Sequence, residues 1–421
     1  MTAETGIGGA DPDQPLKTVA AEGLRRFAFE QPIVGLAVSG GSDSVAMLHL
    51  MADVAQKGGV GLKVATVDHG LRAEAAAEAE DVGRMCRALG VPHSVLLWDH
   101  GAINGNLMQA AREARYGLLA GWAKHCGIST VMLAHTADDQ AETFLMGLSR
   151  LSGLDGLSGM RPKFEQDGTV FCRPFLSVTR RDLRDYLSRQ GIGWIDDPSN
   201  DNLRFTRVKA RQVVRALAPM GITVEGLAAV AHNLSMVQGV VRAATARTAA
   251  EVVVETAGAL VFDRAGLFRD GPEVGRRLLI GMVRWMNGDK HPPREAQVAT
   301  LSDAITSCVD ATLGGVRFKW KGDRCTVTRE PRALGHAVAL GQVWDNRWVV
   351  VGATKGELRA VGANGLAQIP DWRSVGLARG VALATPGVWE GERLISAPLL
   401  RFGASCNATI TPSFVSFLLS H

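Results

Sequence analysis

The feature that most constrains the fold is a regular alternation of strand-like and helix-like segments between residues 32 and 145. Aliphatic, β-rich runs occupy 33–40, 61–70, 93–98 and 129–135, and helix-like segments occupy 44–58, 73–90, 106–127 and the residues from 137 onward. This alternation predicts an α/β domain, with a parallel sheet and helices on both faces. Ligands of such sheets bind at the carboxyl ends of the strands, where the loops at Ser39, Asp68 and His135 are expected.

The length of the chain predicts further domains. At roughly 150 residues per domain, 421 residues correspond to about three domains. Pro219 marks a boundary because proline does not continue a helix. We therefore expect an α/β catalytic domain over 1–217, a mainly helical domain over 218–334 and a small β-rich C-terminal domain over 335–421.

Composition excludes several classes of protein. The net charge of +4 does not by itself indicate a nucleic-acid binder. The six cysteines form no C-x-x-C pair, which argues against a zinc ribbon, an iron–sulfur cluster or a disulfide scaffold. The N-terminus shows no secretory signal, and no apolar run reaches the ~18 residues that span a membrane. We expect a cytoplasmic protein without membrane attachment.

The loop after the first strand, SGGSDS (39–44), carries the main chemical signal. Gly40 and Gly41 have no Cβ, so their backbone amides can approach an anion closely. The start of the next helix adds positive potential, and three hydroxyl groups add donors. These hydroxyls belong to Ser39, Ser42 and Ser44. The pattern predicts a pyrophosphate cradle without the G-K-[ST] ending of a Walker A loop, and the alternative is an ordinary serine- and glycine-rich turn.

This loop resembles the signature of the PP-loop (N-type) ATP pyrophosphatases, an adenine-nucleotide alpha hydrolase-like group. Its members split ATP between the α and β phosphates to adenylate a substrate. The resemblance implies that Ser39 to Ser44 bind the ATP phosphates and that Asp43 lies near Mg²⁺ or the nucleophile. Asp139 is the second magnesium ligand that we expect.

Five further motifs follow in a fixed order: VDHGLR (67–72), NLMQAAREARY (106–116), LAHTADDQAET (133–143), GLDGLSGM (153–160) and DDPSNDNLRFTRVKAR (196–211). Together they resemble the tRNA(Ile)-lysidine synthetase family over roughly residues 30–217. The resemblance implies ligation of free L-lysine to C2 of the wobble cytidine, in an isoleucine tRNA with a CAU anticodon. The reaction would pass through an adenylated cytidine and give lysidine, AMP and pyrophosphate, so that the tRNA reads AUA. The oligomeric state stays open, a homodimer included.

Two positions depart from the family pattern. Val208 stands where an asparagine usually follows the arginine of the basic motif, and Leu151 stands where a glycine is usual. Neither change removes an expected catalytic group.

The motifs supply the expected site residues. The catalytic set is Asp43, Asp138, Asp139 and Arg207. The two histidines expected beside ATP, in addition to the loop, are His69 and His135. The expected tRNA-binding residues are Arg112, Arg115, Arg204, Lys209 and Arg211.

Each group also has a structural interpretation. Acids near a helix start are favoured by the helix dipole, and Thr136 with Asp139 fits the spacing of a capping box. The basic cluster after 203 fits a phosphate-binding surface, but also a solvated helix face. Histidines at strand ends are often structural.

Two other functions remain open from the sequence. A PP-loop tRNA thiolase would need paired or nucleophilic cysteines, and none has such a setting. A catalytically dead tRNA-binding relative is disfavoured by the presence of Asp43, Asp138 and Asp139.

Overall fold

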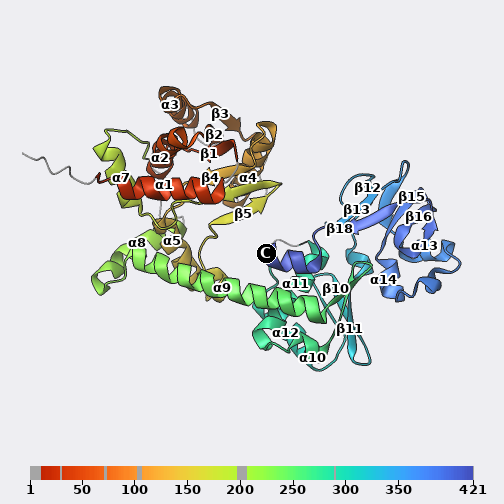
Figure 1. The fold of residues 1–421 in the computed structure, drawn as a ribbon. Coiled ribbons are helices and arrows are strands. Elements are labelled where there is room, and N and C mark those ends of the chain that lie inside the picture. Colours follow the sequence, from red (N-terminus) through yellow and green to blue (C-terminus); the bar gives the residue numbers. More distant parts are fainter. Residues whose placement is uncertain are drawn as a thin grey trace, which may run out of the picture. The chain divides into compact units, whose positions relative to one another are not determined.

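The strands expected from the sequence form one sheet in the first part of the chain. The computed structural model describes residues 11–28, 31–70, 74–101, 107–196, 206–288 and 291–420 (Figure 1). The chain divides into two compact units, Met1–Gln238 and Gly239–His421. No single helix of the described residues is long and apolar enough to cross a membrane; a pair bent by 104°, Thr206–Met220 with Val224–Val252, passes by length and composition only.

A six-stranded sheet in the order β3-β2-β1-β4-β6-β5 is the frame of the first unit. Its strands are β1 (Ile33–Ala37), β2 (Gly61–Asp68), β3 (His93–Leu97), β4 (Thr130–Leu133), β5 (Lys163–Gln166) and β6 (Thr169–Cys172). All neighbouring pairs are parallel except the hairpin of β5 and β6. The four strands expected from the sequence are β1 to β4, and the β5–β6 hairpin was not predicted.

Helices cover both faces of this sheet. They are α1 (Gln14–Phe27), α2 (Ser42–Gly58), α3 (Ala75–Ala88), α4 (Leu107–His125), α5 (Ala137–Leu148), α6 (Leu154–Leu157), α7 (Arg180–Arg189) and α8 (Thr206–Leu217). Apolar residues of α1, α2, α3 and α7 share one core with the sheet, among them Met47 and Leu183. The apolar side of α4, with Leu119 and Trp122, forms a second core with β1, β2 and β4. The predicted α/β architecture is therefore confirmed.

Two helix ends show how local sequence sets the chain path. α2 ends at Gly58, as expected, and the next residue, Gly59, takes the left-handed conformation with φ +67°. After α5, the exposed Leu151 has φ +54°, a conformation that favours glycine. Leu151, which stands where the family pattern has a glycine, thus occupies a backbone conformation that a glycine would adopt without strain.

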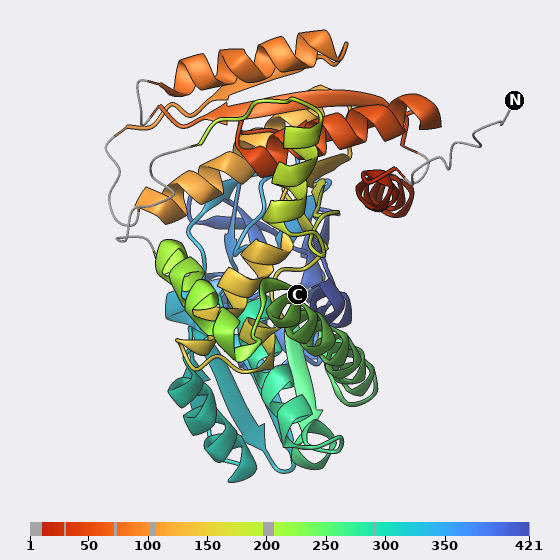
Figure 2. The ribbon, with the colours of Figure 1, turned by 90° about the vertical axis from the view of Figure 1, so that its left-hand side faces the viewer.

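The long helix α9 (Val224–Val252) begins in the first unit and ends in the second. Figure 1 shows it as one unbroken helix, and the perpendicular view in Figure 2 looks almost along its axis. Its first turns pack on α5 and α8 through a small apolar cluster that contains Ala141, Val214 and Leu227.

An antiparallel sheet in the order β7-β8-β11-β10-β9 follows in the second unit. Its strands are β7 (Val254–Thr256), β8 (Ala259–Asp263), β9 (Ala311–Leu313), β10 (Val316–Lys321) and β11 (Arg324–Arg329), and its helices are α10 (Arg264–Leu267), α11 (Pro272–Asn287) and α12 (Glu295–Thr306). Residues 218–334, expected to be mainly helical, therefore also contain a sheet. The strands β7 and β8 were missed because they are short and follow a long helical run.

The last part of the chain is β-rich, as predicted. A second antiparallel sheet has the order β12-β14-β15-β16-β17, and β13 pairs with β18. The strands are β12 (Val338–Ala339), β13 (Trp348–Val351), β14 (Glu357–Ala360), β15 (Pro386–Glu390), β16 (Arg393–Ala397), β17 (Phe402–Gly403) and β18 (Asn407–Ile410), with helices α13 (Gly362–Gln368), α14 (Arg379–Leu383) and α15 (Phe414–Ser420).

Side chains join the earlier and later parts of the second unit. Phe414 and Leu418 of α15 belong to the same core as α11, and the rings of Phe414 and Trp285 meet edge to face at 5.8 Å. Arg329 at the end of β11 donates through Nη2 to Oδ1 of the buried Asp345 at 3.0 Å. The division at residues 334 and 335 stays a prediction, because apolar and ionic contacts join the two parts.

Candidate active site

The SGGSDS loop (39–44), called the phosphate loop below, is a tight turn between β1 and α2. Gly40 has φ +89°, which favours glycine, and a Cβ at this position would lie 2.7 Å from Cδ1 of Ile195. Ser44 closes the turn: its Oγ accepts from the backbone N of Ser39 at 3.1 Å and donates to the carbonyl oxygen of Gly41 at 2.9 Å. A Cβ at Gly41 would meet no atom closer than 3.9 Å. The loop is therefore pinned at both ends and open at Gly41, as an anion cradle requires.

A cluster of carboxylates lies at the start of α5, directly after β4. Thr136 is the N-cap residue, and its backbone N donates to Oδ2 of Asp139 at 2.9 Å. The other oxygen of Asp139, Oδ1, lies 3.4 Å from Nη1 of Arg207. The structural interpretation of Asp139 is confirmed, because one of its oxygens caps the helix. Its other oxygen faces a cation.

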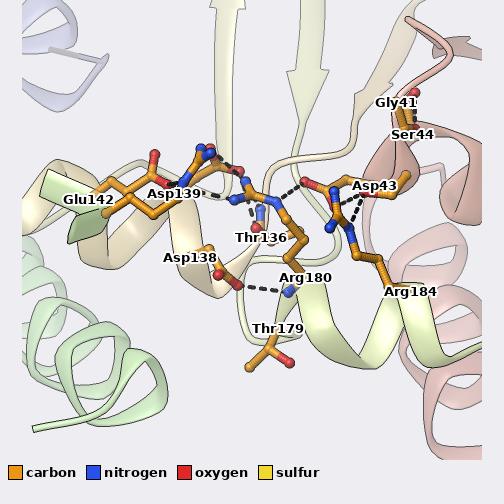
Figure 3. A network of polar contacts seen from close by, with 12 residues as sticks. Gly41, Asp43, Ser44, Thr136, Asp138, Asp139, Glu142, Thr179, Arg180 and Arg184 are labelled. Atoms are coloured by element: carbon orange, nitrogen blue, oxygen red, sulfur yellow. Dashed lines mark hydrogen bonds and ion pairs between the residues drawn. The ribbon is translucent and has the colours of Figure 1, made fainter. Parts of the chain in front are cut away.

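Arg180, the first residue of α7, joins the phosphate loop to this cluster (Figure 3). Its Nε donates to Oδ2 of Asp43 at 2.9 Å, and its backbone N donates to Oδ2 of Asp138 at 2.7 Å. The guanidinium also lies 3.8 Å from Asp139 and 3.7 Å from Glu142. Arg180 thus contacts the three carboxylates that were expected to be catalytic, and it also contacts Glu142.

Glu142 lies one turn beyond Asp138 and is 2% exposed. Its Oε1 accepts from Nε of Arg211 at 2.9 Å, whereas its Oε2 is buried without a hydrogen-bond partner among the described residues. A buried carboxylate oxygen without a donor is unfavourable unless a ligand supplies one. Glu142 therefore offers one oxygen to an incoming donor.

The surroundings shift the pKa values of the acids in this cluster in different directions. Burial raises the pKa of Asp43, against the opposing effect of Arg180. Burial and the neighbouring charge of Asp139 likewise raise the pKa of Glu142. Burial also opposes ionisation of Asp139, but the neighbouring His135, Arg180 and Arg207 together outweigh it and hold the pKa of that carboxyl below its ordinary value. The guanidinium of Arg180 is itself buried, yet its carboxylate neighbours raise its pKa, so it stays charged.

The two expected histidines lie at strand ends, as predicted. Burial lowers the pKa of His135 to about 3, so its ring is neutral at pH 7. Its Nδ1 accepts from Nε of Arg173 at 3.1 Å, which leaves the proton on Nε2. Burial and Arg115 lower the pKa of His69, and its Nδ1 is buried without a partner among the described residues. The ring of His69 meets the ring of Trp98 edge to face at 5.8 Å.

The expected tRNA-binding residues fall into different environments. Arg112 is exposed and lies over the Tyr116 ring, whereas burial lowers the pKa of Arg115. On α8, Lys209 is exposed, while Arg207 and Arg211 face the acids of α5. Arg204 lies outside the described residues. Val208 is buried and apolar, so its side chain forms no hydrogen bond.

Sequence reasoning missed two basic residues that the structure brings to the loop. These are Arg180 and Arg184, whose Nε donates to Oγ of Ser42 at 3.2 Å. The available signal was their spacing of four residues within TRRDLR (179–184), which places them on one face of a helix. Glu142 was also not assigned a role from the sequence.

Comparisons with known proteins give a consistent result. A family model described as a PP-loop domain matches residues 14–217. A tRNA(Ile)-lysidine synthase from Ruegeria pomeroyi is 43% identical over 419 residues, covering 96% of this chain and 100% of the relative. The enzymes of the same name from Rhodopseudomonas palustris and Bradyrhizobium diazoefficiens are 38% and 39% identical, covering 75% and 72% of this chain and 96% and 86% of the relatives.

Proposed function

We propose a specific reaction for this chain, which belongs to the tRNA(Ile)-lysidine synthase family. It joins free L-lysine to C2 of the wobble cytidine of an isoleucine tRNA with a CAU anticodon, using ATP and releasing AMP and pyrophosphate. The observation that carries the proposal is the junction of an open phosphate loop with a buried acid cluster, made by Arg180 between Asp43 and Glu142.

The first step is adenylation of the cytidine. The oxygen on C2 attacks the α-phosphorus of ATP, and pyrophosphate leaves. The Ser39–Ser44 loop supports this step because its backbone amides and the start of α2 favour the negative charge of the phosphates. Adenylation turns a poor leaving oxygen into a good one. Arg207, beside Asp139 at the edge of the cluster, is the residue we assign to the α-phosphate.

In the second step the amine of lysine attacks C2 and AMP leaves. A free lysine amine has a pKa near ~10.4, so the site has to bind an ammonium and then take its proton. The Oε2 of Glu142, which has no hydrogen-bond partner in the described part of the chain, suits the first task. The raised pKa of Glu142 suits the second, because a carboxylate that is costly to keep charged accepts a proton more readily.

Magnesium fits this site as a partner of ATP and not as an ion held by protein ligands alone. The described residues contain no group of three His, Cys, Asp or Glu placed to hold a metal. Mg²⁺ is usually bound by one or two carboxylates together with substrate phosphates, and Asp43 and Asp139 flank Arg180 beside the loop. When bound, the ion would neutralise phosphate charge.

The tRNA contacts are proposed on the basic residues of α4 and α8. Arg112 and Lys209 are exposed and available to phosphates. We also keep Arg115 and Arg211 in this set, although Arg211 is paired with Glu142. Arg204 completes the proposed set.

A sulfur-transfer reaction is disfavoured by the cysteines. All six are free, and burial raises the pKa of Cys86 and of Cys172 to about 11. A thiol with so high a pKa is a weak nucleophile at pH 7.

The deciding experiment measures incorporation of labelled lysine into transcripts of isoleucine tRNA with a CAU anticodon, together with pyrophosphate release. We expect both products only when ATP, lysine and this tRNA are all present. A transcript in which the wobble cytidine is replaced by uridine is the matched control. Pyrophosphate release with no preference for lysine or tRNA would refute the proposal.

A further inference from the structure

The phosphate loop has no basic residue of its own. The chain contains neither lysine nor arginine from residue 27 to residue 56. In the described part of the chain, two basic side chains form hydrogen bonds with residues 39–44, and both come from α7. Arg180 donates to Asp43 at 2.9 Å, and Arg184 donates to Ser42 at 3.2 Å (Figure 3).

The helix α7 is a rigid support for these two arginines. Thr179 and Asp182 form a capping box at its start, and Leu183 and Leu187 are buried in the core against the sheet. Arg180 and Arg184 are one helical turn apart, so they share the side that faces the loop. Arg181, by contrast, points to solvent with 89% of its side chain exposed.

Arg184 is held in place by further contacts. Its Nη2 donates to Oδ1 of Asp196 at 2.8 Å, and its guanidinium lies over the Trp194 ring at 5.7 Å. The next residue, Ile195, donates its backbone N to the carbonyl oxygen of Gly40 at 2.9 Å. The segment that positions Arg184 thus also fixes the phosphate loop.

We propose that Arg180 and Arg184 form the cationic wall of the nucleotide site and bind the β and γ phosphates of ATP. The inference rests on the proposed function. When the oxygen of cytidine bonds to the α-phosphorus, the bond from that phosphorus to the α–β bridging oxygen breaks. The electron pair goes to the bridging oxygen, so the leaving pyrophosphate gains negative charge. Two guanidinium groups next to the loop offset this charge and match phosphate oxygens with paired N–H donors.

The two arginines differ in what else they contact. Arg180 also faces Asp139 and Glu142, whereas Arg184 contacts Ser42 and Asp196 and none of the α5 acids. Loss of Arg184 is therefore expected to affect phosphate binding, whereas loss of Arg180 is also expected to affect Glu142, the residue proposed to bind lysine.

The test compares Arg184→Gln with Arg181→Gln, which removes a charge from the solvent side of the same helix. We expect Arg184→Gln to raise the KM for ATP and the inhibition constant of pyrophosphate by about 10-fold, the effect of losing one charge-assisted contact. The KM for lysine should stay within about twofold, and Arg181→Gln should match the unsubstituted chain. Arg180→Gln should raise the KM values for both ATP and lysine, with partial recovery in Arg180→Lys.

Binding of α,β-methylene ATP, which cannot release pyrophosphate, separates this inference from the proposed function. Weaker binding to Arg184→Gln than to Arg181→Gln supports the cationic wall even in a chain that forms no lysidine. Unchanged analogue binding and unchanged pyrophosphate inhibition in Arg184→Gln, with an unaltered melting temperature, would overturn it.

Discussion

The Nε of Arg180 donates to Oδ2 of Asp43 at 2.9 Å, which joins the acid of the phosphate loop to a residue 137 positions later in the chain. Each side chain is 18% exposed, so water screens this ion pair only in part. The contact makes the nucleotide loop and the acid cluster one polar network. A substitution in the loop or in the acid cluster is therefore expected to change the binding of both ATP and lysine, unless the residue lies at the edge of the network.

Asp43→Asn is expected to abolish most catalysis while the fold is kept. The amide preserves the shape of the side chain and a contact with Arg180, but it removes the negative charge available to Mg²⁺ and ATP. We expect pyrophosphate release to fall by on the order of 10²-fold or more. Stopped assays of pyrophosphate and lysidine check the rate, and circular dichroism checks the fold. Near-normal turnover would show that Asp43 has no catalytic role.

Glu142→Gln is expected to weaken lysine binding. The substitution removes the charge behind the unpartnered Oε2, so the ammonium loses a charge-assisted hydrogen bond. The KM for lysine should rise by roughly 10- to 100-fold, with a smaller change in the KM for ATP. Glu113→Gln, an exposed residue of α4, is the control. An unchanged lysine KM in Glu142→Gln would remove this residue from the lysine pocket.

Gly40→Ala is expected to weaken ATP binding in addition to destabilising the fold through backbone strain. A Cβ at Gly40 meets Ile195 at 2.7 Å in addition to the cost of φ +89°. Gly59→Ala is the matched control, because Gly59 also has a positive φ but open space around it. Both variants should lose about 1–2 kcal/mol of stability from the left-handed backbone. Only Gly40→Ala should also bind ATP more weakly, and equal ATP affinities would contradict the role of the loop.

The free energy of unfolding should depend on pH through His135. The unfolded state takes up a proton near the ordinary pKa of ~6.5, whereas the folded state stays neutral down to about 3. Between these values the unfolded chain binds more protons, so stability falls as the pH falls, by at most ~1.4 kcal/mol per pH unit. In His135→Asn the amide oxygen can still accept from Arg173. The melting temperature of this variant should fall less between pH 7 and pH 5 than that of the unsubstituted chain. The exposed His291→Asn should behave as the unsubstituted chain.

The sequence predicted the fold best where the periodicity was strong. The strands β1 to β4 are continuous aliphatic runs separated by helices with clear apolar faces, so they were predicted correctly. The β5–β6 hairpin was missed because both strands have four residues and β5 is largely polar. The helix α1 was not predicted, because it lies before the alternation of strands and helices that begins at β1.

The candidate site shows the same division. Residues within one motif, such as Ser39 to Ser44 or Asp138 and Asp139, are found together because local structure alone brings them together. Arg180 and Arg184 were not predicted, because their spacing places them on one helix face but does not show that α7 packs against α2. Arg207 and Arg211 were predicted from their motif, but their pairing with α5 was not.

The divided use of the Asp139 carboxylate has a consequence for the residues that can replace it. Oδ2 accepts from the backbone of Thr136 while Oδ1 faces two guanidinium groups, so donors approach from both sides. Asparagine, with the same outline, would turn its NH₂ group toward donors in either orientation. Replacing Asp139 is therefore expected to disturb the fold as well as the reaction. A carboxylate is the side-chain group of this size that accepts from the Thr136 backbone and from the two guanidinium groups at once.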